Sequence, residues 1–199
     1  MDDASTYTPE GKSDPADEDL MARVKSGDDG ALELLVRRYE QPLFQYARRM
    51  LGNAADAEDV FQEAFLRVFL HRNRFWSGAP FRPWLYRIAT NLCRDRLRYR
   101  ARRREIQPEA DDGLLDPIAR APAAGIAPDA AAEGEERGRR MREALGALSL
   151  KHRAVFLMAH QEGLTYAEIA RVLRIPAGTV KSRMNKAVSQ LMAALESIE

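Results

Sequence analysis

The sequence predicts an all-α protein built as two small helical domains joined by a flexible linker. Strong helix formers, chiefly leucine, alanine and arginine, dominate a chain of 199 residues of which 45% are hydrophobic. Apolar residues recur at helical spacing in several separate segments, and glycine, proline or capping residues bound these segments. The composition then changes abruptly after Arg104, which indicates a boundary between two parts of the chain.

The charge balance and the cysteine content limit the classes of protein to consider. The 31 basic and 30 acidic residues leave a formal net charge of +1, so no overall attraction to nucleic acid or membranes is predicted. Cys93 is the single cysteine, which excludes an internal disulfide and suits a reducing compartment. No apolar run approaches the roughly 18 residues of a membrane span, and the acidic N-terminus lacks the apolar region of a signal peptide. We therefore expect a soluble, cytoplasmic protein.

Four segments follow from these composition changes. Residues 1–16 are polar and acidic and are interpreted as a disordered tail. The first helical domain is expected over residues 17–104. Residues 105–137 contain four prolines, many alanines and an excess of acid, which predicts a flexible linker with at most transient helix. The second helical domain is expected over residues 138–199.

The first domain contains four predicted helices. A short helix over 18–25 precedes a longer, strongly periodic one that ends at Gly52, and Pro42 should kink or split this second helix. An acidic start predicts a third helix from about residue 54. The loop RFWSGAP separates it from a fourth helix that begins at about Pro83, because proline suits a first turn.

The second domain should begin near Gly138 and end with a candidate helix-turn-helix. Ser149 is expected to cap one helix, and Thr165 with Glu168 forms the capping box of the next. Pro176 then forces a turn before a last helix that begins at about Ala177. The stripe of this last helix that is expected to be buried consists of Val180, Met184, Ala187, Val188 and Leu191.

The remaining faces of the last helix carry residue types that donate to phosphates and base edges. They lie in the half of the helix that enters the major groove in helix-turn-helix proteins. The candidate set, with Arg174 before the turn, is Arg174, Thr179, Lys181, Ser182, Arg183, Asn185 and Lys186. A solvated basic face on an ordinary helical hairpin is the alternative. No acidic residue occurs from Ile169 to Leu195, which argues against this alternative because ordinary exposed faces mix both signs.

The fourth helix interleaves aromatic rings with a dense run of arginines. Such a pattern suits a nucleic-acid strand with unstacked bases, because arginines follow the phosphates while rings stack on bases. The aromatic residues are Phe75 and Trp76 in the preceding loop, then Trp84 and Tyr86. Alternatively, Trp84 and Tyr86 are core residues and the arginines only solubilise the end of a helix. For Phe75 and Trp76, the exposure expected of a loop favours contact with a base.

Acidic residues on the third helix require a choice between a metal site, a simple helix start and a docking face. Asp59 and Glu63 share one face at i, i+4, but the three histidines are scattered and none lies nearby in ligand register. We therefore expect no metal. The chain also has no glycine-rich phosphate loop, no cysteine cluster and no nucleophile elbow, so neither an enzyme nor a cofactor is expected. Cys93 is interpreted as a buried structural thiol.

Three segments in this order resemble one family. DAEDVFQEAFLRVF (56–69), FRPWLYRIATNLCRDRLRYRARR (81–103) and LTYAEIARVLRIPAGTVKSRMNKA (164–187) are similar to the extracytoplasmic-function (ECF) sigma factors, the small members of the sigma-70 family of bacterial transcription initiation. The resemblance covers residues 17–104 and 138–196, and it implies that residues 17–104 are region 2 and residues 138–199 are region 4.

The resemblance implies three functional surfaces. One would dock on the clamp helices of the largest subunit of core RNA polymerase, through Asp59, Gln62, Glu63 and Leu66. A second would capture and hold the melted −10 element of a promoter, through Phe75, Trp76, Arg82, Trp84, Arg87, Asn91, Arg94, Arg96 and Arg98. The candidate residues around the last helix would read the −35 element as duplex. An anti-sigma factor is a further implied partner, and membrane insertion is not.

Two rival functions remain at this point. A stand-alone helix-turn-helix regulator would use the same final helices, but it would need a dimer interface or a sensor domain that residues 17–104 do not resemble. A helical adaptor would use its basic faces to hold an acidic protein. Tight binding to palindromic DNA without polymerase would favour the stand-alone regulator. A complex with an acidic protein that forms without nucleic acid would favour the adaptor.

Overall fold

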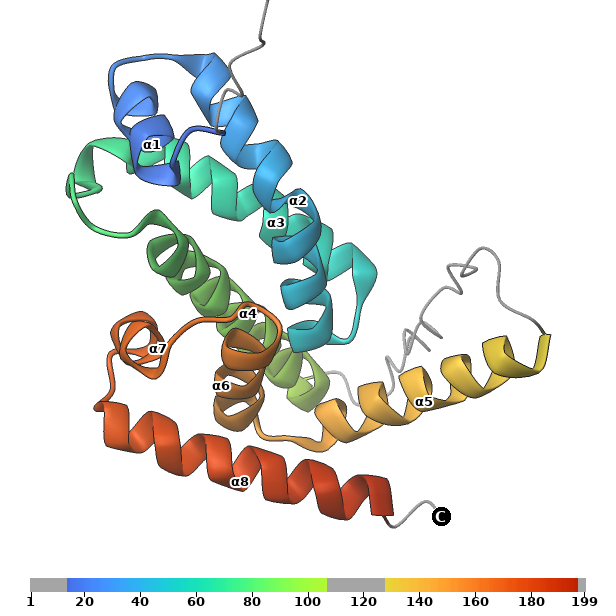
Figure 1. Ribbon diagram of the computed structural model, residues 1–199. Helices are drawn as coiled ribbons and strands as arrows, with labels where there is room; N and C mark the ends of the chain where they lie inside the picture. Colours follow the sequence, from blue (N-terminus) through green and yellow to red (C-terminus); the bar gives the residue numbers. More distant parts are fainter. Residues whose placement is uncertain (1–13, 107–127, 197–199) are drawn as a thin grey trace, which may run out of the picture.

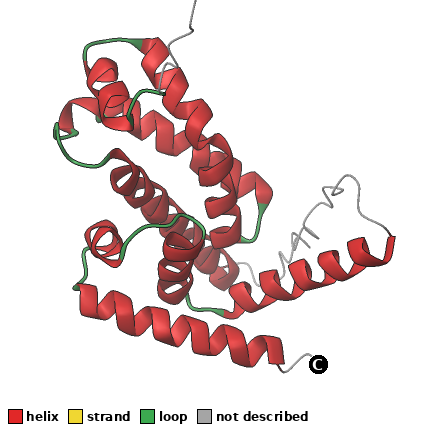
Figure 2. Cartoon of the chain, viewed as in Figure 1, coloured by secondary structure: helices red, strands yellow, loops and turns green. Residues whose placement is uncertain are grey.

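The computed structural model describes residues 14–106 and 128–196, and every regular element in these residues is a helix (Figures 1 and 2). The predicted all-α class is therefore confirmed. Most of the predicted tail and of the predicted linker lies outside the described residues.

The N-terminal helices are α1 to α4, with a single 3₁₀ turn before the last. Their bounds are α1 Asp17–Lys25, α2 Asp29–Leu51, α3 Ala54–Leu70, η1 Arg72–Arg74 and α4 Phe81–Ile106. The ends of these helices follow from local chemistry. The Asn53 side chain accepts a hydrogen bond from the Asp56 amide at 3.0 Å, and Gly52 adopts a left-handed φ of 70° between α2 and α3.

Pro42 does not split α2, so of the two expected effects, a kink or a split, the split is wrong. The helix runs continuously from Asp29 to Leu51 with Pro42 inside it and exposed. Proline removes one backbone hydrogen bond, at a cost of about 3 kcal/mol. The buried Leu35 and Tyr39 before it, and Leu43 and Tyr46 after it, belong to one core, so packing on both sides of Pro42 stabilises the continuous helix.

The core of the N-terminal helices is built around α2. Leu35, Leu43, Tyr46 and Met50 have no exposed surface. The ring of Tyr46 packs edge-on against Tyr86 of α4 with centroids 5.1 Å apart, and its hydroxyl lies 2.8 Å from the Thr90 hydroxyl. Tyr86 is thus a core residue, which agrees with the alternative that Trp84 and Tyr86 pack in the core.

The C-terminal helices are α5 to α8. Their bounds are α5 Pro128–Ala147, α6 Leu150–His160, α7 Tyr166–Leu173 and α8 Ala177–Glu196. Helical structure therefore begins ten positions before Gly138, because proline suits the first position of a helix and alanines follow Pro128. Part of the segment that we expected to be a linker, 128–137, is thus helical.

The two sets of helices pack against each other. In Figure 1, α6 and α7 lie beside the lower half of α4, and α8 crosses below them. The buried side chains of both sets form one continuous core. The sequence led us to expect two domains connected only by a tether, and direct contact between them is the main departure from that expectation.

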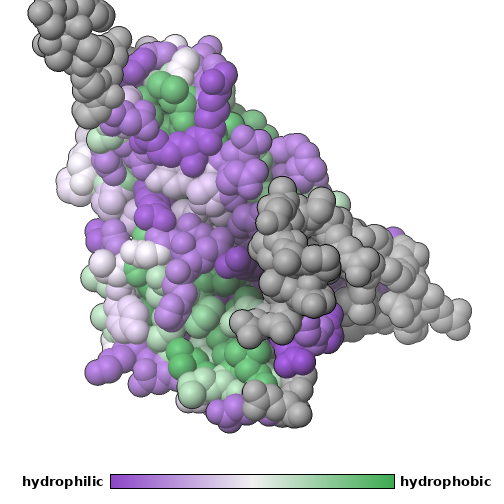
Figure 3. Space-filling model, turned by 45° about the vertical axis from the view of Figure 1, so that its right-hand side comes forward, coloured by the Kyte–Doolittle hydropathy of each residue, from purple (hydrophilic) through white to green (hydrophobic). Residues whose placement is uncertain are grey.

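The surface is predominantly hydrophilic on the face shown in Figure 3, with hydrophobic residues gathered toward its lower end. At the end of the molecule where α8 lies, Met192 is 56% exposed. None of the described helices combines the length and the apolar character needed to cross a membrane.

Candidate nucleic-acid and polymerase interfaces

α7 and α8 form a helix-turn-helix with well-defined ends. The Thr165 side chain accepts from the Glu168 amide, and the Glu168 carboxylate accepts from the Thr165 amide at 2.8 Å, so the predicted capping box is present. The Thr165 hydroxyl also donates to this carboxylate at 2.7 Å, and the hydrogen bonds from the hydroxyl and the amide of Thr165 hold the pKa of Glu168 below its usual value. At the other end of α7, the Ile175 amide donates to the Ala170 carbonyl at 3.1 Å and closes the turn.

The apolar stripe of α8 is buried, and its polar residues lie on the other faces of the helix. Val180, Met184, Ala187 and Leu191 are buried, as predicted, while Val188 is half-buried. The candidate DNA-binding residues lie on the other faces. Lys181, Ser182, Asn185 and Lys186 are exposed, and Thr179 and Arg183 are half-buried. All of these side chains therefore lie outside the buried stripe of α8.

Arg174 has an unusual backbone conformation at the end of α7. Its φ of 55° is the one positive value among the described non-glycine residues. Left-handed backbone costs an L-residue roughly 1–2 kcal/mol and costs glycine almost nothing. The residue is exposed, and only its backbone is needed for the turn.

Replacing Arg174 by glycine is therefore expected to leave the free energy of unfolding unchanged or to raise it by about 1 kcal/mol, while weakening binding to promoter DNA. The matched control is Arg171→Gly, at an exposed position inside α7, which should lower the free energy of unfolding by about 1 kcal/mol. Chemical denaturation measures both. A destabilised Arg174→Gly variant would contradict the strained-turn interpretation.

The two aromatic residues of the loop before α4 differ in exposure. Trp76 is 76% exposed, whereas Phe75 is 4% exposed and packs against Trp84 and Phe81 with ring centroids 5.1 and 6.1 Å away. We expected both rings to be exposed and therefore able to contact a base. This exposure is confirmed for Trp76 and wrong for Phe75. The Lys25 ammonium also donates to the Phe75 carbonyl at 3.0 Å, which fixes the loop on α1.

The polar residues of α4 lie along one long helix, but they are not equally free. Arg94 and Arg98 are exposed, while Arg82, Trp84, Arg87 and Asn91 are half-buried. Arg96 instead pairs with Asp56 at 3.3 Å and with Asp59, both on α3. Sequence reasoning counted Arg96 among the strand-holding arginines and missed these two partners.

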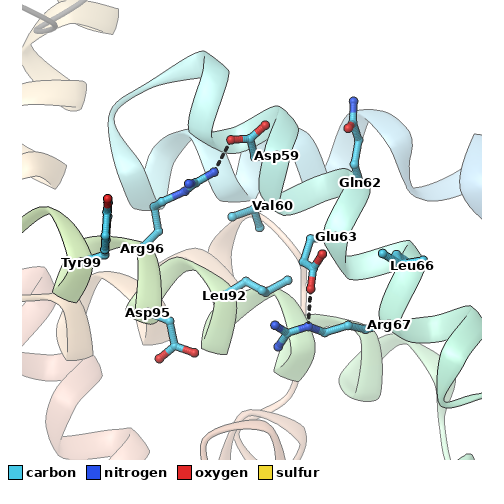
Figure 4. A pocket seen from close by; sticks show the side chains of 10 residues that line it. All are labelled: Asp59, Val60, Gln62, Glu63, Leu66, Arg67, Leu92, Asp95, Arg96 and Tyr99. Carbon is cyan, nitrogen blue, oxygen red and sulfur yellow. Dashed lines mark hydrogen bonds and ion pairs between the residues drawn. The ribbon is translucent and has the colours of Figure 1, made fainter.

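A groove between α3 and α4 contains the predicted docking residues (Figure 4). Asp59, Gln62, Glu63 and Leu66 all line it from α3. Leu66 is 51% exposed, and the Glu63 carboxylate accepts from the Arg67 guanidinium at 2.8 Å. α4 adds Leu92, Asp95, Arg96 and Tyr99 as the opposite wall. An exposed leucine beside carboxylates suits a partner helix with apolar and basic residues. Tyr99, which is 55% exposed here, was not among the residues that the sequence singled out.

A second cleft lies between α4 and the C-terminal helices. Candidate DNA-binding residues from both sets line it: Arg87, Asn91 and Arg94 from α4, with Arg174 and Arg183 from the helix-turn-helix. Lys151 adds a further positive charge, and no acidic side chain is among the residues that line the cleft. The structure thus brings together residues that the sequence assigned to two different sites.

Cys93 is the one cysteine of the chain, and it is buried. Burial raises the pKa of Cys93 to about 12, so its thiol is neutral at physiological pH, in agreement with a structural role. Across residues 14–106 and 128–196, no group of three or more potential ligands is placed to hold a metal ion.

Both parts of the chain match one family. Residues 35–103 match Sigma-70 region 2, and residues 138–191 match Sigma-70, region 4. The ECF RNA polymerase sigma factor SigW of Bacillus subtilis (strain 168) is 34% identical over 177 residues, which cover 88% of this chain and 95% of SigW. The RNA polymerase sigma-H factor of Pseudomonas aeruginosa PAO1 is 31% identical over 193 residues, covering 92% of this chain and 95% of that factor.

Solved structures agree with this relationship. The structure of CnrH in complex with the cytosolic domain of CnrY aligns with a TM-score of 0.69 at 26% identity, covering 93% of this chain and 100% of CnrH. The sigma factor RpoE from Bartonella quintana, solved with the anti-sigma factor NepR, has the same fold, with a TM-score of 0.64 at 24% identity and coverage of 84% and 96%.

The fold and the two matched regions define a transcription initiation factor of the sigma-70 type rather than a regulator built on a helix-turn-helix alone. The chain belongs to the ECF group of sigma-70 factors. It accordingly directs core RNA polymerase to specific promoters, and proteins of this family are initiation factors rather than enzymes.

Proposed function

We propose that this sigma factor divides promoter recognition between its two sets of helices. α8, with Arg174, reads the −35 element as duplex through its exposed polar faces. Trp76 captures a base of the −10 element, and α4 holds the melted strand with Arg82, Arg87, Asn91 and the exposed arginines. The observation that carries the proposal is the contrast within α8, where the apolar stripe is buried and every candidate DNA-binding residue lies outside it.

Docking on core polymerase would occur at the groove between α3 and α4. Asp59, Gln62, Glu63 and Leu66 line this groove and would meet the clamp helices of the largest subunit. The division into polymerase-binding and DNA-binding faces follows from their chemistry. The docking groove combines three carboxylates and two arginines with exposed apolar surface, whereas the cleft between α4 and the C-terminal helices is lined by basic side chains and by no acidic one.

Tight promoter binding by the free protein is not expected. A good base contact discriminates by roughly 1–3 kcal/mol, each part offers few of them, and the net charge of +1 gives little general attraction to DNA. Core polymerase would supply the geometry that lets both parts bind together. Trapping an unstacked base would then favour the open promoter, since extruding a base costs a few kcal/mol.

Arg183→Ala in the assembled holoenzyme tests the assignment of α8. Loss of one bidentate base contact should weaken binding to the intact promoter by about 5- to 150-fold, which corresponds to roughly 1–3 kcal/mol. Binding to a promoter with a scrambled −35 element should change little, and so should binding to core polymerase. Quantitative gel shifts with both promoters measure this difference. Equal loss on both DNAs would contradict a base-reading role and indicate a contact to phosphate only.

Three further proposals follow from the relatives and the family. CnrH was solved with the cytosolic domain of CnrY, and RpoE with the anti-sigma factor NepR. We propose that an anti-sigma factor also binds this chain. We further propose that the chain carries no catalytic activity of its own and acts in the cytoplasm, where core polymerase acts.

A further inference from the structure

The loop before α4 is held at both of its ends by α1. We call residues 75–81 the capture loop. At its start, the Lys25 ammonium donates to the Phe75 carbonyl at 3.0 Å. At its end, the Glu18 carboxylate accepts from the Phe81 amide at 2.9 Å. The sequence patterns assigned no function to Glu18 or Lys25, but these two side chains attach the loop to α1.

The spacing of the two residues along α1 matches this arrangement. Glu18 and Lys25 are seven positions apart, so they lie on one face of the helix, two turns apart. A rise of 1.5 Å per residue separates their backbones by about 10 Å along the helix axis. On the opposite side of α1, Leu20 and Val24 are buried in the core. The helix therefore packs on the core with one face and contacts the capture loop with another.

α1 is also fixed to its neighbour α2 by polar contacts. The Asp17 carboxylate at the start of α1 accepts hydrogen bonds from the Arg38 guanidinium and from the Tyr39 hydroxyl, both on α2. Because α1 is attached in this way, the positions of Glu18 and Lys25 are defined by the core and not by the loop itself. The loop is thus connected to the core through α1 as well as through the helices that flank it in sequence.

The Glu18 contact has a second consequence at the start of α4. Phe81 is the first residue of α4, and the first amides of a helix have no partner within the helix. A carboxylate at this end satisfies one of these amides and interacts favourably with the helix dipole. Glu18 therefore fixes the point at which the loop passes into α4, directly before Arg82, which we propose to hold the melted strand.

The tip of the capture loop depends on these attachments for its direction. Trp76 is 76% exposed, so packing contributes little to the orientation of its ring. The Ala79 amide donates to the Trp76 carbonyl at 3.0 Å, and Gly78 has a left-handed φ of 97°, so the tip is a tight turn. Ordering a loop during binding costs free energy, and a loop that is ordered before binding avoids this cost.

We propose that Glu18 and Lys25 are positioning residues for promoter opening, which hold the capture loop so that Trp76 is already presented to the base when the DNA arrives. This inference rests on the proposed function, in which Trp76 captures a base of the −10 element. Neither positioning residue contacts the base. Each acts through the backbone of the loop, Lys25 at the Phe75 carbonyl and Glu18 at the Phe81 amide.

A spin label at the tip of the loop tests the ordering without DNA. Ser77 is exposed, and the native Cys93 is buried with a neutral thiol, so a thiol-specific nitroxide labels the full-length Ser77→Cys chain at residue 77. We expect Glu18→Ala and Lys25→Met each to make the label more mobile in its electron paramagnetic resonance spectrum. An unchanged spectrum in both variants would overturn the proposal.

Two other charged residues of α1 provide matched controls. Asp19 is exposed beside Glu18, and Asp19→Ala removes a carboxylate that does not contact the loop. Arg23 pairs with Asp28 at 2.8 Å, so Arg23→Met removes a cation from the same helix. Neither control should change the mobility of the label or the opening of a promoter, and circular dichroism checks that every variant is folded.

The effect on opening is measured with the holoenzyme on a promoter mapped by in vitro transcription. Fluorescence of 2-aminopurine in the −10 element reports the extruded base. Glu18→Ala and Lys25→Met should each reduce base extrusion by about 2- to 10-fold, because the loop must then be ordered during capture. Binding to core polymerase and to the −35 element should not change. Glu18→Gln keeps an acceptor oxygen and Lys25→Arg keeps a donor, so both should retain most of the extrusion.

A double-mutant cycle with Trp76→Ala separates positioning from a general loss of structure. If Glu18 and Lys25 act through Trp76, their variants should cause no further loss of extrusion in the Trp76→Ala background. A full additional loss there would overturn the proposal. Normal extrusion by both α1 variants, with Trp76→Ala impaired, would overturn it as well and leave base capture intact. Normal extrusion by Trp76→Ala itself would instead refute base capture, and the positioning role with it.

Discussion

Replacing Glu63 by arginine is expected to abolish stable binding to core polymerase while the chain remains folded. The carboxylate lies in the docking groove, and its partner in the free protein is Arg67, one turn further along α3. Reversing its charge would place two cations side by side and oppose the basic surface expected of the clamp helices. Like-charge contacts at an interface cost several kcal/mol, so the affinity should fall by at least 100-fold.

Co-purification and titration with core polymerase measure this loss, and circular dichroism checks the fold. Glu40→Arg is the matched control, because Glu40 is an exposed acidic residue on α2 outside the groove. It makes the same charge change and should bind as the wild type does. Unchanged binding of the Glu63→Arg variant would refute the docking groove, whereas equal losses in both variants would indicate a general effect of charge.

Trp76→Ala is expected to impair promoter opening by about 5- to 150-fold and to leave the stability of the protein almost unchanged. Stacking of a base on an aromatic ring contributes roughly 1–3 kcal/mol. The indole is 76% exposed, so truncating it removes little packing. The holoenzyme should therefore still assemble and still bind the −35 element. Permanganate reactivity of unpaired thymines at the −10 element measures the open complex.

Two further variants make the assignment of the loop specific. Trp76→Phe retains an aromatic face and should recover most of the opening. Phe75→Ala removes a buried ring and should lower the free energy of unfolding by about 3–5 kcal/mol. Normal opening by Trp76→Ala holoenzyme would exclude base capture by this ring.

Several helix ends were predictable because local chemistry determines them. The capping box at Thr165, the left-handed Gly52 and the apolar stripe of α8 each depend on residues only a few positions apart. Pro42 shows the limit of such reasoning. Whether a proline breaks a helix depends on packing contributed by distant segments, and the sequence pattern contains no measure of that packing.

For the candidate surfaces, the sequence predicted sets of residues but not the environments of their side chains. Arg96 follows the arginine pattern of α4, yet its partners Asp56 and Asp59 are about 40 positions away. Glu162 carries no motif at all, and its buried position against Tyr86 depends on how the two sets of helices meet. Contacts between residues 76 positions apart arise from tertiary packing, which neither periodicity nor capping rules encode.

The unequal burial of Phe75 and Trp76 also bears on how promoter preference can change among related sigma factors. The buried ring and the Lys25 contact anchor the loop, while its tip contributes almost nothing to the stability of the fold. Substitutions at residues 76–78 are therefore nearly free of structural penalty, apart from the left-handed Gly78, whose φ is 97°. With Trp76 as the proposed base-capturing residue, a stable scaffold can acquire a new −10 specificity by exchanging one or two exposed side chains, and specificity can diverge faster than the fold.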